Sequence, residues 1–374
     1  MNTGYLFFRF PRGILSLMLL YWFLFLIPAG WALSRHHPSK PRPQERLLFA
    51  LAWMLTALLL LALIGLRHEV GGDWGNYLPY VEAASYLTLS ESLRMADPGY
   101  AALNWLGANL GGGIYTVNTL CSLLFSLGVV AFAKQLPRPS LAIAVAVPYL
   151  ILVVAMGYSR QGVALGLAMA GLAFLQRGGL WKFVLTISIA GIFHKSAIVL
   201  ILIALTSRSK HRLLTGVAIL GIGGGLYVLL MAEAVDALRV GYLDAEYQSA
   251  GAGVRVAMNA LPAAVFLWYR KRFQIDEEQR RLWTVISLIA LAFIGALALS
   301  PSSTAVDRVA LYLIPLQLFV WSHFPEVFGK PGRCNTMGVL LVLVLYATVL
   351  FTWLNFAHHR SGWIPYKFYP LELL

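Results

Sequence analysis

Charged residues are scarce in this chain of 374 residues, where Asp, Glu, Lys and Arg together make up 12%. Hydrophobic residues make up 59%, and the mean hydropathy is +0.72. Many apolar runs reach the roughly 20 residues that a helix needs to cross a bilayer. This composition excludes a string of soluble domains. It predicts an all-α fold, a polytopic transmembrane helical bundle that occupies residues 1–374 as a single integral membrane domain.

Cysteine and the common cofactor motifs are also nearly absent. The two cysteines, Cys121 in an apolar run and Cys334 in a basic loop, do not predict a disulfide. The chain has no CxxC, HExxH or Walker loop, so we expect no metal site, no nucleotide site and no cofactor. The first apolar run, 14–33, lacks a small-residue cleavage site and is interpreted as a retained span rather than a signal peptide.

Apolar runs long enough to span a membrane recur along the chain. We expect about ten full spans, at residues 14–33, 47–66, 114–133, 139–157, 162–176, 213–232, 255–269, 282–299, 309–325 and 338–357. Segment 183–206 is a further apolar run, with His194 and Lys195 at its centre. A charged lysine at mid-membrane depth costs roughly 3 kcal/mol or more, so this pair indicates a polar cavity or a site. One helix of this length would cross the membrane, whereas two halves that meet at the pair would enter and return.

The distribution of basic residues distinguishes these two topologies. A re-entrant segment 183–206 places most of the 29 Lys and Arg residues in cytoplasmic loops, whereas a single crossing divides them about evenly between the two sides. The positive-inside rule therefore predicts a re-entrant helical pair, although Arg9 and Arg12 then lie outside. Most acidic residues also fall outside, and the net charge of +13 is expected to attract anionic lipid headgroups rather than nucleic acid.

The longest outer loop in this topology, 67–113, begins with RHEVGGDWGNY. Its paired glycines permit a tight turn, after which Asp73 places a carboxylate beside the rings of Trp74 and Tyr77. Aromatic faces with neighbouring carboxylates are common in sugar sites, so these residues are candidates for one. A turn with interfacial aromatic anchors is the alternative explanation.

Two further helices are expected to begin on the same outer face. Residues 97–106 have the periodicity of a short amphipathic helix that lies along the interface, with Asp97 as its N-cap. Arg160 and Gln161, in the run YSRQGVALG, start a helix rich in small residues. An arginine at a helix N-terminus opposes the macrodipole unless an anion binds there. Arg160 is therefore a candidate anion ligand, and snorkelling to lipid headgroups is the alternative.

The remaining outer polar residues form three groups. His194 and Lys195 either form a site or only place a hairpin tip in water. Asp307 and Arg308 precede the span 309–325 and either serve a site or form a mutual ion pair. The C-terminal run HHRSGWIPYKFYP returns to the outer face, and its adjacent histidines are poorly placed to share one metal ion.

Together these residues predict one outer cavity with a defined chemistry. Its expected cations are Arg67, Arg160, Lys195 and Arg308, and its candidate bases are Asp73, His194 and Asp307. Such a cavity suits a polyanionic leaving group and a hydroxyl nucleophile.

In this order, the motifs resemble those of the EpsG family of exopolysaccharide-synthesis membrane proteins, which behave like Wzy-type polymerases. The matching pieces are GGDWGNY near Asp73, DPGY, YSRQGVALG at Arg160 and Gln161, IAGIFHKSA at His194 and Lys195, and DRVALYL at Asp307 and Arg308. The resemblance covers residues 67–320 and reaches the C-terminal WIPY.

The resemblance implies a GT-C-like membrane glycosyltransferase of the bacterial inner membrane. Such an enzyme would join oligosaccharide repeat units carried on undecaprenyl pyrophosphate, at the periplasmic face and by metal-independent glycosyl transfer. The expected partners are the lipid-linked oligosaccharide substrate, membrane lipids and a chain-length regulator, and no nucleic acid.

Each candidate residue then has an expected role. The pyrophosphate would be held by Arg160 and Lys195, with help from Arg308 or Arg67, and the sugars would be contacted by Trp74, Tyr77 and Gln161. The acceptor proton would be taken by Asp73 or His194, with Asp307 as a further candidate base. The alternatives are a flippase for lipid-linked oligosaccharides, an O-antigen-type ligase, a transferase that adds one sugar, and a membrane acyltransferase.

Overall fold

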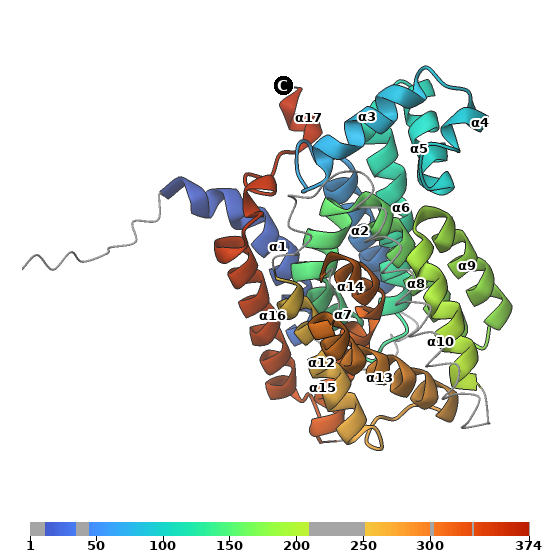
Figure 1. The fold of residues 1–374 in the computed structure, drawn as a ribbon. Helices are drawn as coiled ribbons and strands as arrows, with labels where there is room; N and C mark the ends of the chain where they lie inside the picture. Colours follow the sequence, from blue (N-terminus) through green and yellow to red (C-terminus); the bar gives the residue numbers. More distant parts are fainter. Residues whose placement is uncertain (1–11, 35–44, 209–250, 300–302, 331–332, 374) are drawn as a thin grey trace, which may run out of the picture.

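The computed structural model describes residues 12–34, 45–208, 251–299, 303–330 and 333–373. This part of the chain contains helices and no β-strand, only an isolated bridge between Arg67 and Phe368, which confirms the all-α prediction. Among the described residues, five helices are long and apolar enough to cross a membrane: α2 (Arg46–Gly65), α6 (Gly113–Ala133), α12 (Ala252–Tyr269), α13 (Glu277–Leu299) and α16 (Thr336–Phe356). The chain is therefore a polytopic helical membrane protein (Figure 1).

The other predicted spans correspond to shorter or interrupted helices. The run 14–33 lies in α1 (Arg12–Ser34), 162–176 lies in α8 (Ser159–Gln176), and 139–157 corresponds to α7 (Pro139–Ala146) followed by the π-helix η2 (Val147–Ala155). Pro148 stands in the first turn of η2 and has no N–H to donate, which explains why the regular helix ends there. The predicted span 213–232 lies outside the described residues.

The predicted span 309–325 is divided in the structure. A short helix, α14 (Ser303–Ala310), and a 3-10 turn precede α15 (Pro315–Phe328). Pro315 occupies the first turn of α15, where the missing N–H costs nothing. Asp307 and Arg308 are therefore carried on a separate helix that ends just before α15.

The expected helix break at His194 and Lys195 is present. Helix α9 (Leu180–Phe193) ends before His194, which is extended with φ −158° and ψ 114°. A 3-10 turn, η3 (Lys195–Ile198), then leads into α10 (Val199–Arg208). The break is confirmed, whereas a re-entrant path through the membrane remains a prediction.

Glycines allow α6 and α8 to approach closely. A β-carbon built on Gly128 would lie 1.8 Å from the carbonyl oxygen of Gly166, so neither position can carry a side chain without moving the helices apart. Small residues at helix contacts are typical of membrane bundles, where packing rather than water exclusion drives association. This contact fixes α8 against the rest of the bundle.

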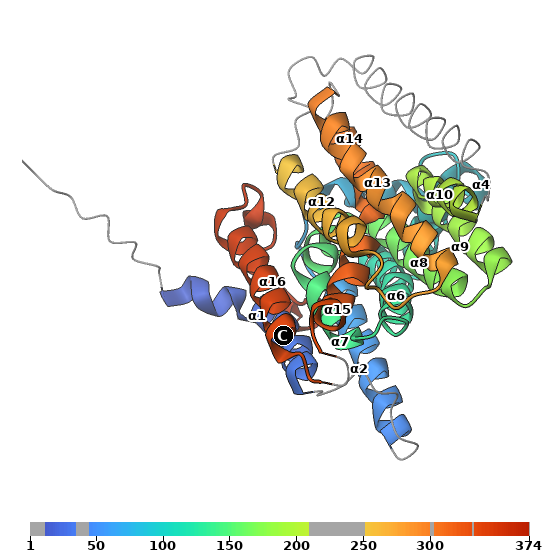
Figure 2. The same ribbon diagram turned by 90° about the horizontal axis from the view of Figure 1, so that it is seen from below.

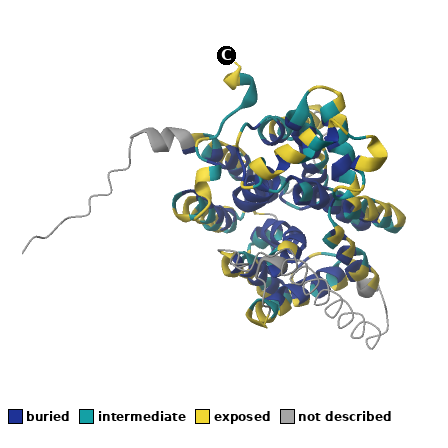
Figure 3. Cartoon of the chain, turned by 45° about the horizontal axis from the view of Figure 1, so that its top comes forward, coloured by how far each residue is buried: buried dark blue, intermediate teal, exposed yellow. Residues whose placement is uncertain are grey.

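Short helices gather at one end of the bundle, at the top of Figure 1. They are α3 (Trp74–Ala84), α4 (Leu89–Ser92), α5 (Pro98–Asn109) and α17 (Tyr369–Glu372). We call this end the α3–α5 end. Seen along the bundle, α1 and α16 lie on one side and α9 and α10 on the other (Figure 2). Buried residues face the interior and exposed residues line the outward faces of the helices (Figure 3).

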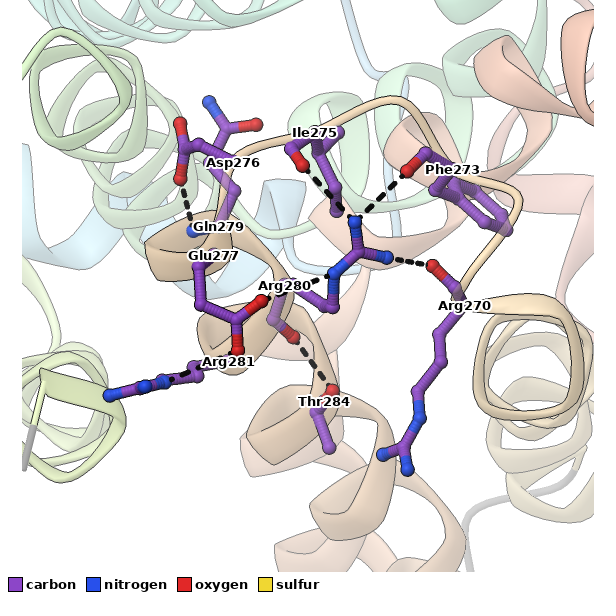
Figure 4. Close-up of polar contacts among 9 residues, drawn as sticks. All are labelled: Arg270, Phe273, Ile275, Asp276, Glu277, Gln279, Arg280, Arg281 and Thr284. Atoms are coloured by element: carbon purple, nitrogen blue, oxygen red, sulfur yellow. Dashed lines mark hydrogen bonds and ion pairs between the residues drawn. The ribbon is translucent and has the colours of Figure 1, made fainter. Parts of the chain in front are cut away.

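The basic loop between α12 and α13 lies at the opposite end of the bundle and is ordered by Arg280. Its guanidinium donates to the carbonyl oxygens of Arg270, of Phe273 at 3.3 Å and of Ile275 at 3.2 Å (Figure 4). Glu277 lies 3.5 Å from this guanidinium. The predicted topology places this loop and the α3–α5 end on opposite sides of the membrane, and this sidedness stays a prediction.

Candidate functional site

A polar cavity of about 330 Å³ opens near the α3–α5 end. Its lining comes from α3, α5, α8, α14 and the break after α9, and consists of Asp73, Tyr77, Asp97, Tyr158, Arg160, Gln161, His194, Lys195, Ser196, Asp307, Arg308 and Leu311. Most of the residues predicted from the sequence are therefore brought together, from segments far apart in the chain. Arg67 and Trp74 are the predicted site residues that do not line it.

The turn that carries Asp73 depends on a close approach of two backbones. Gly71 has φ +114°, and a β-carbon there would lie 2.2 Å from the carbonyl oxygen of Met156. The backbone N–H of Asp73 donates to the carbonyl oxygen of Gly157 at 3.4 Å. Only glycine fits position 71, and the turn is thereby placed against the segment that leads into α8.

The carboxylate of Asp73 is held by neutral donors. Its oxygens accept from the amide of Asn76 at 3.3 Å and from the hydroxyl of Tyr77 at 3.5 Å. Burial raises the pKa of the Asp73 carboxyl above its ordinary value, in opposition to the hydrogen bond from Asn76 and the charges of Arg160 and Arg308. A carboxylate with a raised pKa is a stronger base than one paired directly with a cation.

Arg160 lies in the first turn of α8 and reaches into the cavity. Its Nη1 forms an ion pair with Asp97 Oδ2 at 3.2 Å, and its Cζ lies 5.9 Å from the ring centres of both Tyr80 and Tyr100. The side chain remains 33% exposed, so a ligand can reach it. The helix N-terminus and the guanidinium together favour an anion here.

Asp97 stands at the N-cap position of α5, as predicted, but its side chain has another partner. The helix predicted over 97–106 is present as α5, but the Asp97 side chain makes no capping hydrogen bond to it. The carboxylate instead turns to Arg160. The predicted N-cap position is confirmed, but the side chain does not cap the helix, because a cation from α8, distant in sequence, binds its carboxylate.

His194 and Lys195 occupy the wall formed by the break between α9 and η3. The Nε2 atoms of His194 and Gln161 lie 3.3 Å apart. The other ring nitrogen of His194, Nδ1, is buried and has no hydrogen-bond partner among the described residues. Lys195 is exposed. The wall therefore offers an imidazole nitrogen and an ammonium group to a ligand.

Asp307 forms an ion pair with Arg255. Its Oδ1 accepts from Arg255 Nε at 2.6 Å, across the contact between α12 and α14. Arg255 is a partner of Asp307 that sequence reasoning missed. Arg255 stood at the first position of the predicted span 255–269, and a cation at that boundary was the available signal.

Arg67 is buried away from the cavity, with 1% of its surface exposed. Its Nε donates to the carbonyl oxygen of Val70 at 3.0 Å, and its Nη2 donates to Ser159 Oγ at 2.9 Å and to Asn118 Oδ1 at 3.2 Å. The expected direct contact with pyrophosphate does not fit this position. Arg67 instead connects the end of α2 to the start of α8, beside Arg160.

The C-terminal run packs against the turn that carries Asp73. Trp363 is 2% exposed, and its indole N–H donates to the carbonyl oxygen of Leu152 at 2.8 Å. A β-carbon on Gly157 would lie 2.6 Å from this ring. The backbone N–H of Gly71 donates to Gly362 at 2.8 Å. Sequence reasoning placed this run on the outer face but did not predict that one of its side chains is inserted into the bundle.

Comparison with known proteins gives one family. The model of the EpsG family matches residues 50–368, which is most of the chain. No curated protein matches the chain. No solved structure matches it either.

Proposed function

This chain belongs to the EpsG family, a family of Wzy-like polymerases, and we propose that it polymerises oligosaccharide repeat units carried on undecaprenyl pyrophosphate. The reaction would take place at the periplasmic face of a bacterial inner membrane. The observation that carries the proposal is the cavity, which brings Arg160, Lys195 and Arg308 together with Asp73 and His194. Cations that can neutralise a leaving pyrophosphate there lie beside groups that can accept a proton.

The donor in this proposal is the growing glycan on its lipid pyrophosphate. Arg160, Lys195 and Arg308 hold the pyrophosphate, and the first of them exchanges the carboxylate of Asp97 for phosphate oxygens. As the bond between the anomeric carbon and the pyrophosphate oxygen breaks, the electron pair leaves with that oxygen. Positive charge that is already in place stabilises the leaving group without reorganisation.

The acceptor is a hydroxyl at the non-reducing end of the incoming lipid-linked unit. Its oxygen attacks the anomeric carbon and its proton passes to Asp73, which has a raised pKa and whose hydrogen-bond donors among the described residues, Asn76 and Tyr77, are neutral. Asp307 is the weaker candidate because Arg255 binds it directly. His194 and Gln161, which contact each other, orient the acceptor, with Tyr77 beside Asp73. Direct displacement inverts the anomeric centre.

Reconstitution tests the proposal. The full-length protein is placed in liposomes with one defined oligosaccharide on undecaprenyl pyrophosphate, and the products are separated on a gel. A ladder of repeats with released undecaprenyl pyrophosphate is the expected result. One added sugar would indicate a transferase, and one transferred chain a ligase. Unchanged substrate that has crossed the bilayer would indicate a transporter and overturn the proposal.

A further inference from the structure

Four aromatic rings form a cluster on the α3–α5 end, outside the cavity. They belong to His68, Trp74, Tyr115 and Tyr369, and we call them the aromatic platform. The rings of Tyr115 and Tyr369 are stacked with centres 3.5 Å apart, and His68 lies 6.1 Å from Tyr115 and 6.4 Å from Tyr369. Trp74 lies 6.0 Å from both His68 and Tyr115. All four side chains are partly exposed.

The platform is held rigidly by the C-terminal run. The backbone N–H of Tyr369 donates to Leu66 at 2.8 Å, and that of His68 donates to Lys367 at 3.0 Å. His68 Nδ1 lies 2.6 Å from the hydroxyl of Tyr115, so these two rings also have a fixed orientation. Rings that are already fixed lose little entropy when a ligand binds.

Polar groups border the rings. Glu69 is 54% exposed and Lys367 is 37% exposed, and they form an ion pair with each other. Glu69 also lies 3.9 Å from His68 Nε2. A sugar ring presents C–H groups on one face and hydroxyls at its edge, so it matches aromatic surfaces that are bordered by hydrogen-bonding groups.

The platform and the cavity share one turn. Asp73 lines the cavity, and Trp74, the next residue, belongs to the platform. Consecutive residues at the start of a helix point in directions about 100° apart, which sends these two side chains to different sides of the turn. A glycan that reacts at Asp73 therefore passes close to the platform.

We infer that the aromatic platform is a carbohydrate-binding subsite that holds sugar residues of the glycan away from the reacting bond. This inference rests on the proposed function. Interfacial anchoring is the alternative role for exposed Trp and Tyr, but anchoring rings reach outward to lipid headgroups. The platform rings pack on one another, and Trp74 also rests over the guanidinium of buried Arg67 at 5.8 Å.

Binding of soluble glycan tests the inference separately from polymerisation. The probe is a set of oligosaccharide fragments obtained by mild acid hydrolysis of the exopolysaccharide from the strain that carries this chain. Their affinity is measured for the full-length protein in nanodiscs. Trp74→Ala and Tyr369→Ala should each lower the affinity about tenfold, whereas Tyr369→Phe, which keeps the ring, should stay within about twofold of the unmodified protein. Trp268→Ala is the matched control, because Trp268 is 84% exposed near the opposite end of the bundle.

Hydroxyl-radical footprinting of the unmodified protein tests the same inference without relying on the folding of a variant. Bound fragments should protect Trp74 and Tyr369 from hydroxyl radicals and leave Trp268 unprotected. If the protein forms a glycan ladder in liposomes but shows neither protection nor a ring-dependent affinity, the platform is not a sugar subsite and the proposed polymerase stands. If fragments bind to the platform and no ladder forms, the subsite stands and the proposed polymerase fails.

Discussion

Replacing Arg160 by alanine separates its proposed role in catalysis from a role in stability. The ion pair with Asp97 is partly exposed, since 33% of the Arg160 side chain and 16% of the Asp97 side chain are accessible. Pairs of this kind contribute about 0–1 kcal/mol. The variant should therefore unfold within a few degrees of the unmodified protein.

The expected effect on the reaction is much larger. A hydrogen bond to a charged group contributes about 1.5–3 kcal/mol, and removal of one preorganised donor to a developing anion lowers rates about 100- to 1000-fold. Arg160→Ala should lower kcat/KM by about that factor. The rate is measured in liposomes as release of undecaprenyl pyrophosphate from one defined lipid-linked substrate.

Asp97→Asn is the matched comparison because it breaks the same ion pair by removing the negative charge and keeps Arg160. If Arg160 acts on the pyrophosphate, Asp97→Asn leaves the guanidinium in place and should retain at least about half of the rate. If the pair only fixes α5 to α8, the two variants should be equally impaired. Equal losses, or full activity in Arg160→Ala, would refute the anion role.

Three further predictions follow from other parts of the site. Asp73→Asn should abolish ladder formation. In the unmodified protein the rate should fall as the pH is lowered, and this fall should begin above the ordinary pKa range of aspartate. The reason is that the base must be ionised and burial raises the pKa of Asp73. A pH-rate profile without such an acidic limb would contradict this prediction. Arg67→Met should lower the free energy of unfolding by about 3 kcal/mol or more, since its buried partners at Asn118 and Ser159 lose their donor, and an unchanged melting temperature would count against it. Gly157→Ala should lower both melting temperature and activity, because the new methyl group would lie 2.6 Å from Trp363. Gly295→Ala, where no described residue lies within 4 Å of the new methyl group, should change neither.

Local patterns in the sequence predicted most of the long helices and the break at His194, but not the interruptions within 139–157 and 309–325. Apolar length predicts a helix in lipid because every backbone group must be paired within the segment. A histidine and a lysine inside such a run are costly in hydrocarbon, which predicts a polar cavity, and the distribution of basic residues favours a break at this pair over a single crossing helix. The shared cavity could be anticipated for the same reason, since polar residues in a membrane protein must gather where water or another polar group can reach them.

Directions and partners of side chains could not be predicted in this way. Arg67 stands at the end of an apolar run, a position from which an arginine could reach an outer cavity. Its side chain instead donates to Asn118 and Ser159, which are distant in sequence. Asp97 has the sequence context of an N-cap, and its choice between a helix N–H and Arg160 depends on where α8 lies. Each outcome is set by tertiary contacts that no local pattern encodes.

The pairing of charges in the cavity suggests how the site tolerates its position in a membrane. Several uncompensated cations would be costly there, and carboxylates within reach reduce that cost while no substrate is bound. Asp97 does so for Arg160, and Asp307 does so for Arg255. The Arg160–Asp97 pair is more exposed than the Arg255–Asp307 pair. Its nitrogen–oxygen distance is also longer, at 3.2 Å against 2.6 Å. An incoming pyrophosphate carries more charge than one carboxylate and can displace Asp97 from Arg160, while the tighter pair keeps α12 and α14 together. Of these two pairs, the one at Arg160 is therefore the one suited to open during the reaction, and the one at Asp307 is suited to maintain the wall of the cavity.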